Sequence, residues 1–117
     1  MARITSDFFV SAYVRRRNDA GLFTAVVRKG AAEAGAIFVK VNRLDGRADL
    51  YGPLPQAYLD GVDPAIAGGR VFERLLTAAA EDEVDARLAS ERRFDSDLWI
   101  VETEDRDGSS NLDLIEP

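Results

Sequence analysis

The chain has 117 residues, of which 46% are hydrophobic and 31% charged, a balance that predicts a single globular domain over residues 1–117. It contains no cysteine and no histidine. This excludes disulfides, thiolate and imidazole metal sites, cysteine nucleophiles and histidine bases. The net charge of −6 is uneven, because residues 1–58 hold 9 basic against 5 acidic residues and residues 59–117 hold 6 against 16. The two halves either complement each other within the domain or present a surface to a charged partner.

Residues 4–20 form the first predicted helix, with Thr5 as its N-cap and Gly21 as its C-terminal stop. The apolar surface of this helix is wider than one core-facing stripe requires. We therefore expect a homodimer in which the second copy partly buries Phe8, Phe9 and Tyr13. In the alternative, the long irregular segment 54–69 folds back and covers these aromatic side chains within one chain.

A basic cluster, Arg15, Arg16 and Arg17, ends this helix, where cations are favoured by the helix dipole. With Arg28 and Lys29 it forms a candidate anion or nucleic-acid surface, although we consider a nucleic-acid partner the weaker interpretation. No window approaches the ~18 apolar residues of a membrane span, and the N-terminal apolar run precedes the basic residues, unlike a secretory signal. A cytoplasmic protein without membrane contact is expected.

A β-hairpin is predicted around Asp45-Gly46, a pair typical of two-residue type I′ turns. A two-residue turn places Lys40 opposite Tyr51 and Asn42 opposite Asp49. Since side chains alternate between the two faces of a strand, one face of the hairpin then collects a candidate binding surface: Phe38, Lys40, Asn42, Asp49 and Tyr51. The alternative is that Lys40 and Asp49 form a simple ion pair across an exposed sheet face.

The remaining elements complete an α+β domain. Residues 22–29 and 70–76 read as strands, the latter with a helix as the alternative, and residues 82–93 read as a helix capped by Asp82. Residues 98–101 are apolar on both faces and predict a central strand, while residues 111–115 predict an edge strand. The predicted fold is a mainly antiparallel sheet of about five or six strands, with an N-terminal helix and one helix between the fourth and fifth strands.

Asp105 to Glu116 places oxygen-bearing side chains at the spacing of a twelve-residue calcium loop. Ser110 stands where that loop has glycine, and a strand precedes it instead of a helix. A β-turn at Asp107-Gly108 explains the same residues. We therefore predict no metal site and no cofactor.

Several stretches resemble a bacterial family known as domain of unknown function 1491: residues 34–46, 50–53, 93–102 and 104–108. The resemblance spans nearly the whole chain, and its hairpin motif is specific. It implies a bacterial cytoplasmic protein. The family has no established activity, so the resemblance implies no catalytic residue and no ligand.

These observations favour a non-enzymatic module that binds a protein partner or associates with itself. Two other functions stay open. One is a small enzyme that uses Lys40, Asp49 and Tyr51, which requires a pocket around a lysine of lowered pKa. The other is a nucleic-acid-contacting protein that uses the Arg15–Arg17 cluster, which requires the five cations to share one face.

Overall fold

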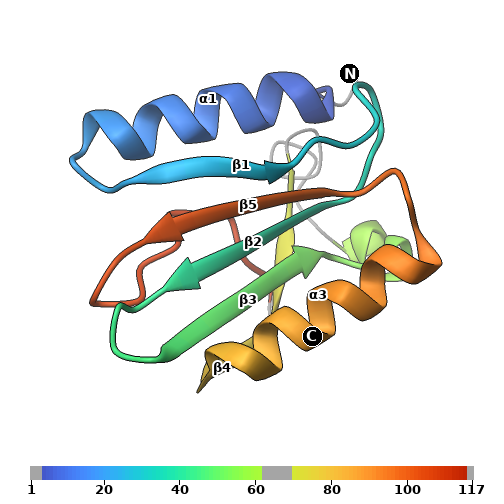
Figure 1. Cartoon of the computed structure of the whole chain (residues 1–117). Coiled ribbons are helices and arrows are strands. Elements are labelled where there is room, and N and C mark those ends of the chain that lie inside the picture. Colours follow the sequence, from blue (N-terminus) through green and yellow to red (C-terminus); the bar gives the residue numbers. More distant parts are fainter. Residues whose placement is uncertain (1–3, 62–69, 116–117) are drawn as a thin grey trace.

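The computed structural model describes residues 4–61 and 70–115, in which a helix lies on each side of a five-stranded sheet (Figure 1). A short 3₁₀ helix, η1 (Gln56–Gly61), follows the third strand, and the rest of the predicted irregular segment, residues 62–69, lies outside the described residues. The helices and strands in chain order are α1 (Ser6–Asp19), β1 (Thr24–Arg28), β2 (Ile37–Asn42), β3 (Arg47–Pro53), β4 (Phe72–Ala80), α3 (Glu81–Phe94) and β5 (Trp99–Glu104).

The strand order is β1-β5-β2-β3-β4, with β2 and β5 parallel and the other neighbours antiparallel. The α+β class and a helix between the fourth and fifth strands are confirmed, but the sheet is mixed and not mainly antiparallel. α3 carries the chain from the β4 edge across to the centre, so that β5 runs in the direction of β2. Because β2 and β5 are apolar on both faces, the centre is where both can be covered.

Each face of the sheet holds a separate apolar core. The core under α1 contains the two buried tyrosines and the tryptophan, and the core under α3 is aliphatic apart from one phenylalanine. The buried residues of the α1 core are Val10, Tyr13, Ile37, Val39, Val41, Tyr51, Phe72, Trp99 and Val101. Those of the α3 core are Phe38, Ala48, Leu50, Val84, Leu88, Leu98 and Ile100. The sheet is thus the middle of three layers, as Figure 1 shows.

Helix α1 begins and ends where its sequence predicts. Thr5 is the N-cap, and its hydroxyl accepts a hydrogen bond from the Phe8 amide at 3.4 Å. Beyond the last turn, Gly21 has φ +84°, and its amide donates to the Asn18 carbonyl at 2.9 Å. This left-handed residue ends the helix and redirects the chain into β1.

The β2–β3 hairpin lies at the predicted place, but its turn differs. The Arg43 amide donates to the Arg47 carbonyl at 3.0 Å, which leaves a three-residue loop over positions 44–46. Leu44 (φ +63°) and Gly46 (φ +85°) have positive φ, and the Asn42 side chain accepts a hydrogen bond from the Leu44 amide at 2.8 Å. The predicted type I′ turn is therefore wrong, and the extra loop residue moves the register by one position.

The C-terminal half follows the prediction in part. A strand, β4, is confirmed over the region where a helix was the alternative, and α3 begins directly after it. The N-cap of α3 is Ala80, which makes no side-chain capping bond, so Asp82 is not the cap. In place of an edge strand over 111–115, a single bridge joins Leu114 to Phe72. No helix of the described residues is long and apolar enough to cross a membrane.

Candidate functional site

The hairpin surface predicted from the sequence is divided between the two faces of the sheet. Phe38, Lys40 and Asn42 share the α3 face, whereas Asp49 and Tyr51 share the α1 face. The predicted pairing of Lys40 with Tyr51, and of Asn42 with Asp49, is wrong by one residue. The observed partners are Val39 with Tyr51, Lys40 with Leu50, Val41 with Asp49, and Asn42 with Ala48.

Lys40 fastens α3 to the sheet. Its side chain is buried, and Nζ lies 2.7 Å from a Glu81 carboxylate oxygen, 2.8 Å from Asp85 and 3.6 Å from Glu102. Burial opposes the charge, but hydrogen bonds to Asp85 and Glu81 outweigh it and raise the pKa of Lys40. A nucleophilic lysine needs the opposite shift. With Asp49 and Tyr51 on the other face, the geometry gives no support to the small enzyme that these three residues suggested.

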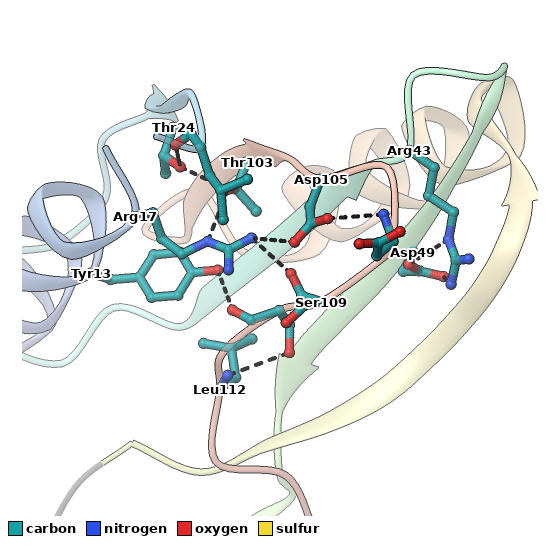
Figure 2. A network of polar contacts seen from close by, with 12 residues as sticks. Tyr13, Arg17, Thr24, Arg43, Asp49, Thr103, Asp105, Ser109 and Leu112 are labelled. Carbon is teal, nitrogen blue, oxygen red and sulfur yellow. Dashed lines mark hydrogen bonds and ion pairs between the residues drawn. The ribbon is translucent and has the colours of Figure 1, made fainter. Parts of the chain in front are cut away.

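Asp49 is a buried anchor on the α1 face. Its carboxylate has no exposed surface and accepts two hydrogen bonds from the Arg43 guanidinium, at 2.9 and 3.0 Å (Figure 2). The same carboxylate accepts the Ala78 amide of β4 at 2.6 Å. The described partners of Asp49 thus lie in β4 and just after the end of β2, which makes Asp49 a structural group that ties β3 to β4 and to the hairpin.

The five predicted cations do not share one face. Arg17 is buried: it donates to the Thr103 hydroxyl at 3.1 Å and the Ser109 carbonyl at 2.7 Å, and it pairs with Asp105 at 3.6 Å (Figure 2). Arg16 stacks over the Tyr13 ring. Arg28 lies opposite Ile100 in the register with β5 and donates a hydrogen bond to the Ser96 carbonyl. Of the five cations, Arg15 and Lys29 line a common groove.

The helix residues predicted for the dimer have different environments. Tyr13 is 1% exposed, and its hydroxyl donates to the Ser110 carbonyl at 2.6 Å, so it belongs to the monomer core. Phe9 packs between Tyr13 and Phe72, while Phe8 is 64% exposed. The C-terminal segment around Ser110 contacts Tyr13. Residues 62–69 of the predicted alternative cover, segment 54–69, lie outside the described residues, so that alternative stays a prediction. A homodimer through α1 stays a prediction, and Phe8 is the residue that it would use.

A groove of about 600 Å³ lies between α1 and β1. Its apolar lining comes from α1, β1 and β5, and includes Val26, which is 43% exposed. Its polar lining includes Arg15 on the helix and Lys29 just after the strand. The full lining is Asp7, Val10, Ser11, Val14, Arg15, Val26, Lys29 and Trp99. The helix therefore covers only part of the sheet beneath it.

A second, smaller depression of about 160 Å³ lies on the opposite face of the same strand. Val27, 61% exposed, lines it together with Leu88 of α3 and Ile100 of β5. Phe23, just before β1, is 64% exposed. Strand β1 therefore presents apolar side chains on both faces of the sheet, each beside a hollow.

The outer edge of β1 pairs with no strand of the described residues, because β1 is the first strand of the sheet and its partner is β5. The pairing is interrupted once, since Val26 lies opposite Val101 and Arg28 opposite Ile100, which leaves Val27 as a bulge. We call β1 with the two hollows the β1 edge surface. Sequence reasoning missed it, and the only local signal was the Val26-Val27 pair in a short strand.

This architecture is that of a small three-layer α+β domain with a mixed five-stranded sheet. The chain matches the family model described as "Protein of unknown function (DUF1491)" over residues 4–113 and belongs to that family. No curated protein matches it.

The same architecture occurs in solved structures of bacterial proteins. The solution structure of a protein from A. tumefaciens has 46% identity and a TM-score of 0.81, with 98% of this chain and 97% of that chain covered. The crystal structure of a DUF1491 family protein from Caulobacter crescentus has 32% identity and a TM-score of 0.75, with 96% and 97% covered. An NMR structure of a DUF1491 family protein from the same bacterium has 32% identity and a TM-score of 0.77, with 98% and 99% covered.

Proposed function

We propose that this protein is a non-enzymatic binding module that takes an extended segment of a partner protein along β1. The observation that supports this is the β1 edge surface, where an edge strand, whose first residue Thr24 is held by the Asn18 side chain, exposes an apolar side chain beside a hollow on each face. Successive side chains of a strand point to opposite faces. A segment added to β1 would therefore direct alternate side chains into the two hollows while its backbone pairs with the edge.

The charges beside the groove favour a partner segment over a second copy of this chain. Arg15 and Lys29 both line the α1 side of the β1 edge surface. A second copy docked strand to strand would bring another Arg15 and another Lys29 to the same edge, where like charges repel. A cytoplasmic location stays a prediction.

The proposal is tested by selecting binders from a random twelve-residue peptide library displayed on phage, with the wild-type protein as bait. The selected peptides should shift the backbone amide resonances of residues 24–28 in nuclear magnetic resonance spectra. They should lose binding to a Val26→Asp/Val27→Asp double variant. Phe94→Asp is the matched control, because Phe94 is the last residue of α3, is 88% exposed and lines neither hollow.

Both substitutions in the β1 variant replace partly exposed side chains, so the variant should keep the circular dichroism spectrum of the wild type. Peptides that bind the folded double variant as tightly as the wild type, or that shift amides elsewhere, would contradict the proposal.

A further inference from the structure

We infer that the segment bound at β1 is acidic and that Arg15 and Lys29 recognise its carboxylates. This inference rests on the proposed function, and it adds the chemistry of the partner. It assigns a specificity role to two residues on different elements, one on α1 and one at the end of β1, that meet beside the same groove.

Both cations are available to a ligand. Arg15 and Lys29 are exposed, and neither makes an ion pair with a described residue. The neighbouring Arg17 is already committed to Asp105 and Ser109. The groove beneath the two free cations is lined by apolar side chains, among them Val26, and a strand laid over that lining would exclude water. Charge pairs at its margin would then interact in a lower dielectric than on an open surface.

The one carboxylate that lines the groove is occupied at the start of α1. Asp7 accepts the Thr5 hydroxyl at 2.7 Å and the Phe8 amide at 2.8 Å. The hydrogen bond from Thr5 is the largest of the causes that lower the pKa of Asp7, and Lys29 also contributes to the shift. Asp7 thus completes the helix N-terminus through Oδ1, and no ion pair among the described residues joins it to Lys29 or Arg15.

We expect the preference for acidic side chains on the α1 side of β1 and not on the α3 side. The smaller hollow beside Val27 contains Arg92, but also Asp85 and Glu102, so its charges are mixed. Helix α3, on the opposite face of the sheet from α1, carries a concentration of carboxylates: Glu81, Asp82, Glu83, Asp85 and Glu91. The chain is therefore negative overall and positive beside the larger groove, which orients an acidic segment toward α1.

The experiment uses three fluorescent eight-residue peptides in which valine alternates with glutamate, glutamine or lysine. Alternation lets one set of side chains, the valines, meet Val27, Leu88 and Ile100 in the smaller hollow while the other set meets Arg15 and Lys29. Fluorescence anisotropy at low salt should show the glutamate peptide binding about 3- to 10-fold tighter than the glutamine peptide, with the lysine peptide weakest. Raising the salt concentration should reduce the difference.

The variant that decides is Arg15→Glu/Lys29→Glu, which should reverse the order so that the lysine peptide binds tightest. Both residues are exposed, so the variant should fold. Arg16→Glu is the matched control: Arg16 is exposed on the same helix but lines a different cavity, so the order should stay as in the wild type.

Equal binding of all three peptides to the wild type, lost on Val26→Asp/Val27→Asp, would overturn the acidic preference and leave the proposed function standing. Binding of none of the three peptides would count against both. An order that survives the charge reversal would also overturn the inference.

Discussion

The two edges of the sheet are built in opposite ways. The β4 edge is long, its register with β3 is irregular at two places, and a bridge from Leu114 covers its first residue. Near its other end, Ala78 has φ +47°, and the buried Asp49 carboxylate holds its amide. The β1 edge has five residues and one bulge, and on its outer side the Asn18 side chain of α1 bonds the backbone N–H and C=O of Thr24, both at 2.9 Å.

The two edges differ in the polar contacts that protect them. Free sheet edges invite pairing with other chains, and proteins protect them with bulges, charges or covering segments. At β4 the protection is extensive and uses the buried carboxylate of Asp49 together with the partly exposed Arg43. At β1 the protection consists of the Asn18 side chain, which bonds both backbone groups of Thr24, together with the bulge at Val27, the short length of the strand and the nearby cations. An edge that is apolar, bordered by cations and without a strand partner beyond Thr24 among the described residues is suited to a selected partner.

The largest expected effect comes from breaking the protected edge with Asp49→Ala. The substitution leaves the Arg43 guanidinium and the strained Ala78 amide without their buried acceptor. Arg43 is partly exposed and can regain water, so we expect a loss of about 3 kcal/mol in the free energy of unfolding. Urea denaturation followed by circular dichroism measures it.

The control for that variant is Asp45→Ala in the exposed turn, where the carboxylate accepts only the Arg47 amide at 3.0 Å. It should cost less than about 1 kcal/mol. Equal losses for the two variants would mean that Asp49 does not hold the edge.

The second prediction concerns the C-terminal segment that covers β4, which Tyr13 holds through the Ser110 carbonyl. Burial raises the pKa of Tyr13 to about 12. Above pH 10 the unfolded chain loses this proton while the folded chain keeps it, so stability falls as pH rises from about 10 to about 12. The difference between the two pKa values corresponds to about 2–3 kcal/mol. Tyr13→Phe should remove this part of the alkaline loss and cost about 1 kcal/mol at pH 7.

Urea denaturation at several pH values from 7 to 12 measures the effect. Burial also raises the pKa of Tyr51, so part of the alkaline slope remains in the variant. Tyr58→Phe is the control, because Tyr58 is 50% exposed in η1. If wild type and Tyr13→Phe lose stability in parallel above pH 10, Tyr13 is not the group that titrates.

The sequence predicts the local features well because they depend on neighbouring residues. Thr5 and Gly21 mark the ends of α1 through bonds within a few positions, and Asp45-Gly46 marks the hairpin. The register of that hairpin depends on Leu44 accepting a positive φ, which is uncommon for leucine. It also depends on two helices that together cover both faces of the sheet.

The sheet edges cannot be predicted from neighbouring residues, because they depend on contacts between residues far apart in the chain. The parallel entry of β5 beside β2 is a contact between residues about 60 positions apart, such as Lys40 and Glu102. This entry leaves β1 as an edge strand and places Val26 and Val27 beside hollows. The three-residue loop of the hairpin, and not this entry, separates Lys40 from Asp49, which is why the predicted binding surface is divided between the two faces of the sheet.

The third prediction concerns the turn whose Gly46 carbonyl accepts the Glu81 amide at the junction of β4 and α3. Gly46 has φ +85°, and an added Cβ would meet nothing within 4 Å, so the cost of Gly46→Val is backbone strain alone. We expect a loss of about 1–2 kcal/mol. Gly46→Asn is the control and should lose less, because asparagine tolerates this conformation. Thermal melts that do not separate the two variants would contradict this explanation.

The smallest effect on stability is expected at the open side of the molecule, where Phe8 of α1 and Val27 of β1 are both more than 60% exposed. Phe8→Glu and Val27→Lys should each change the free energy of unfolding by less than about 0.5 kcal/mol, because neither side chain fills a core.

The two variants separate the two interfaces considered for this chain. If the predicted homodimer through α1 forms, light scattering at tens of micromolar should show folded monomers for Phe8→Glu and an unchanged mass for Val27→Lys. Val27→Lys should instead weaken peptide binding at β1. A wild type that is monomeric under these conditions would contradict the homodimer but not the proposed binding of a partner segment at the β1 edge surface.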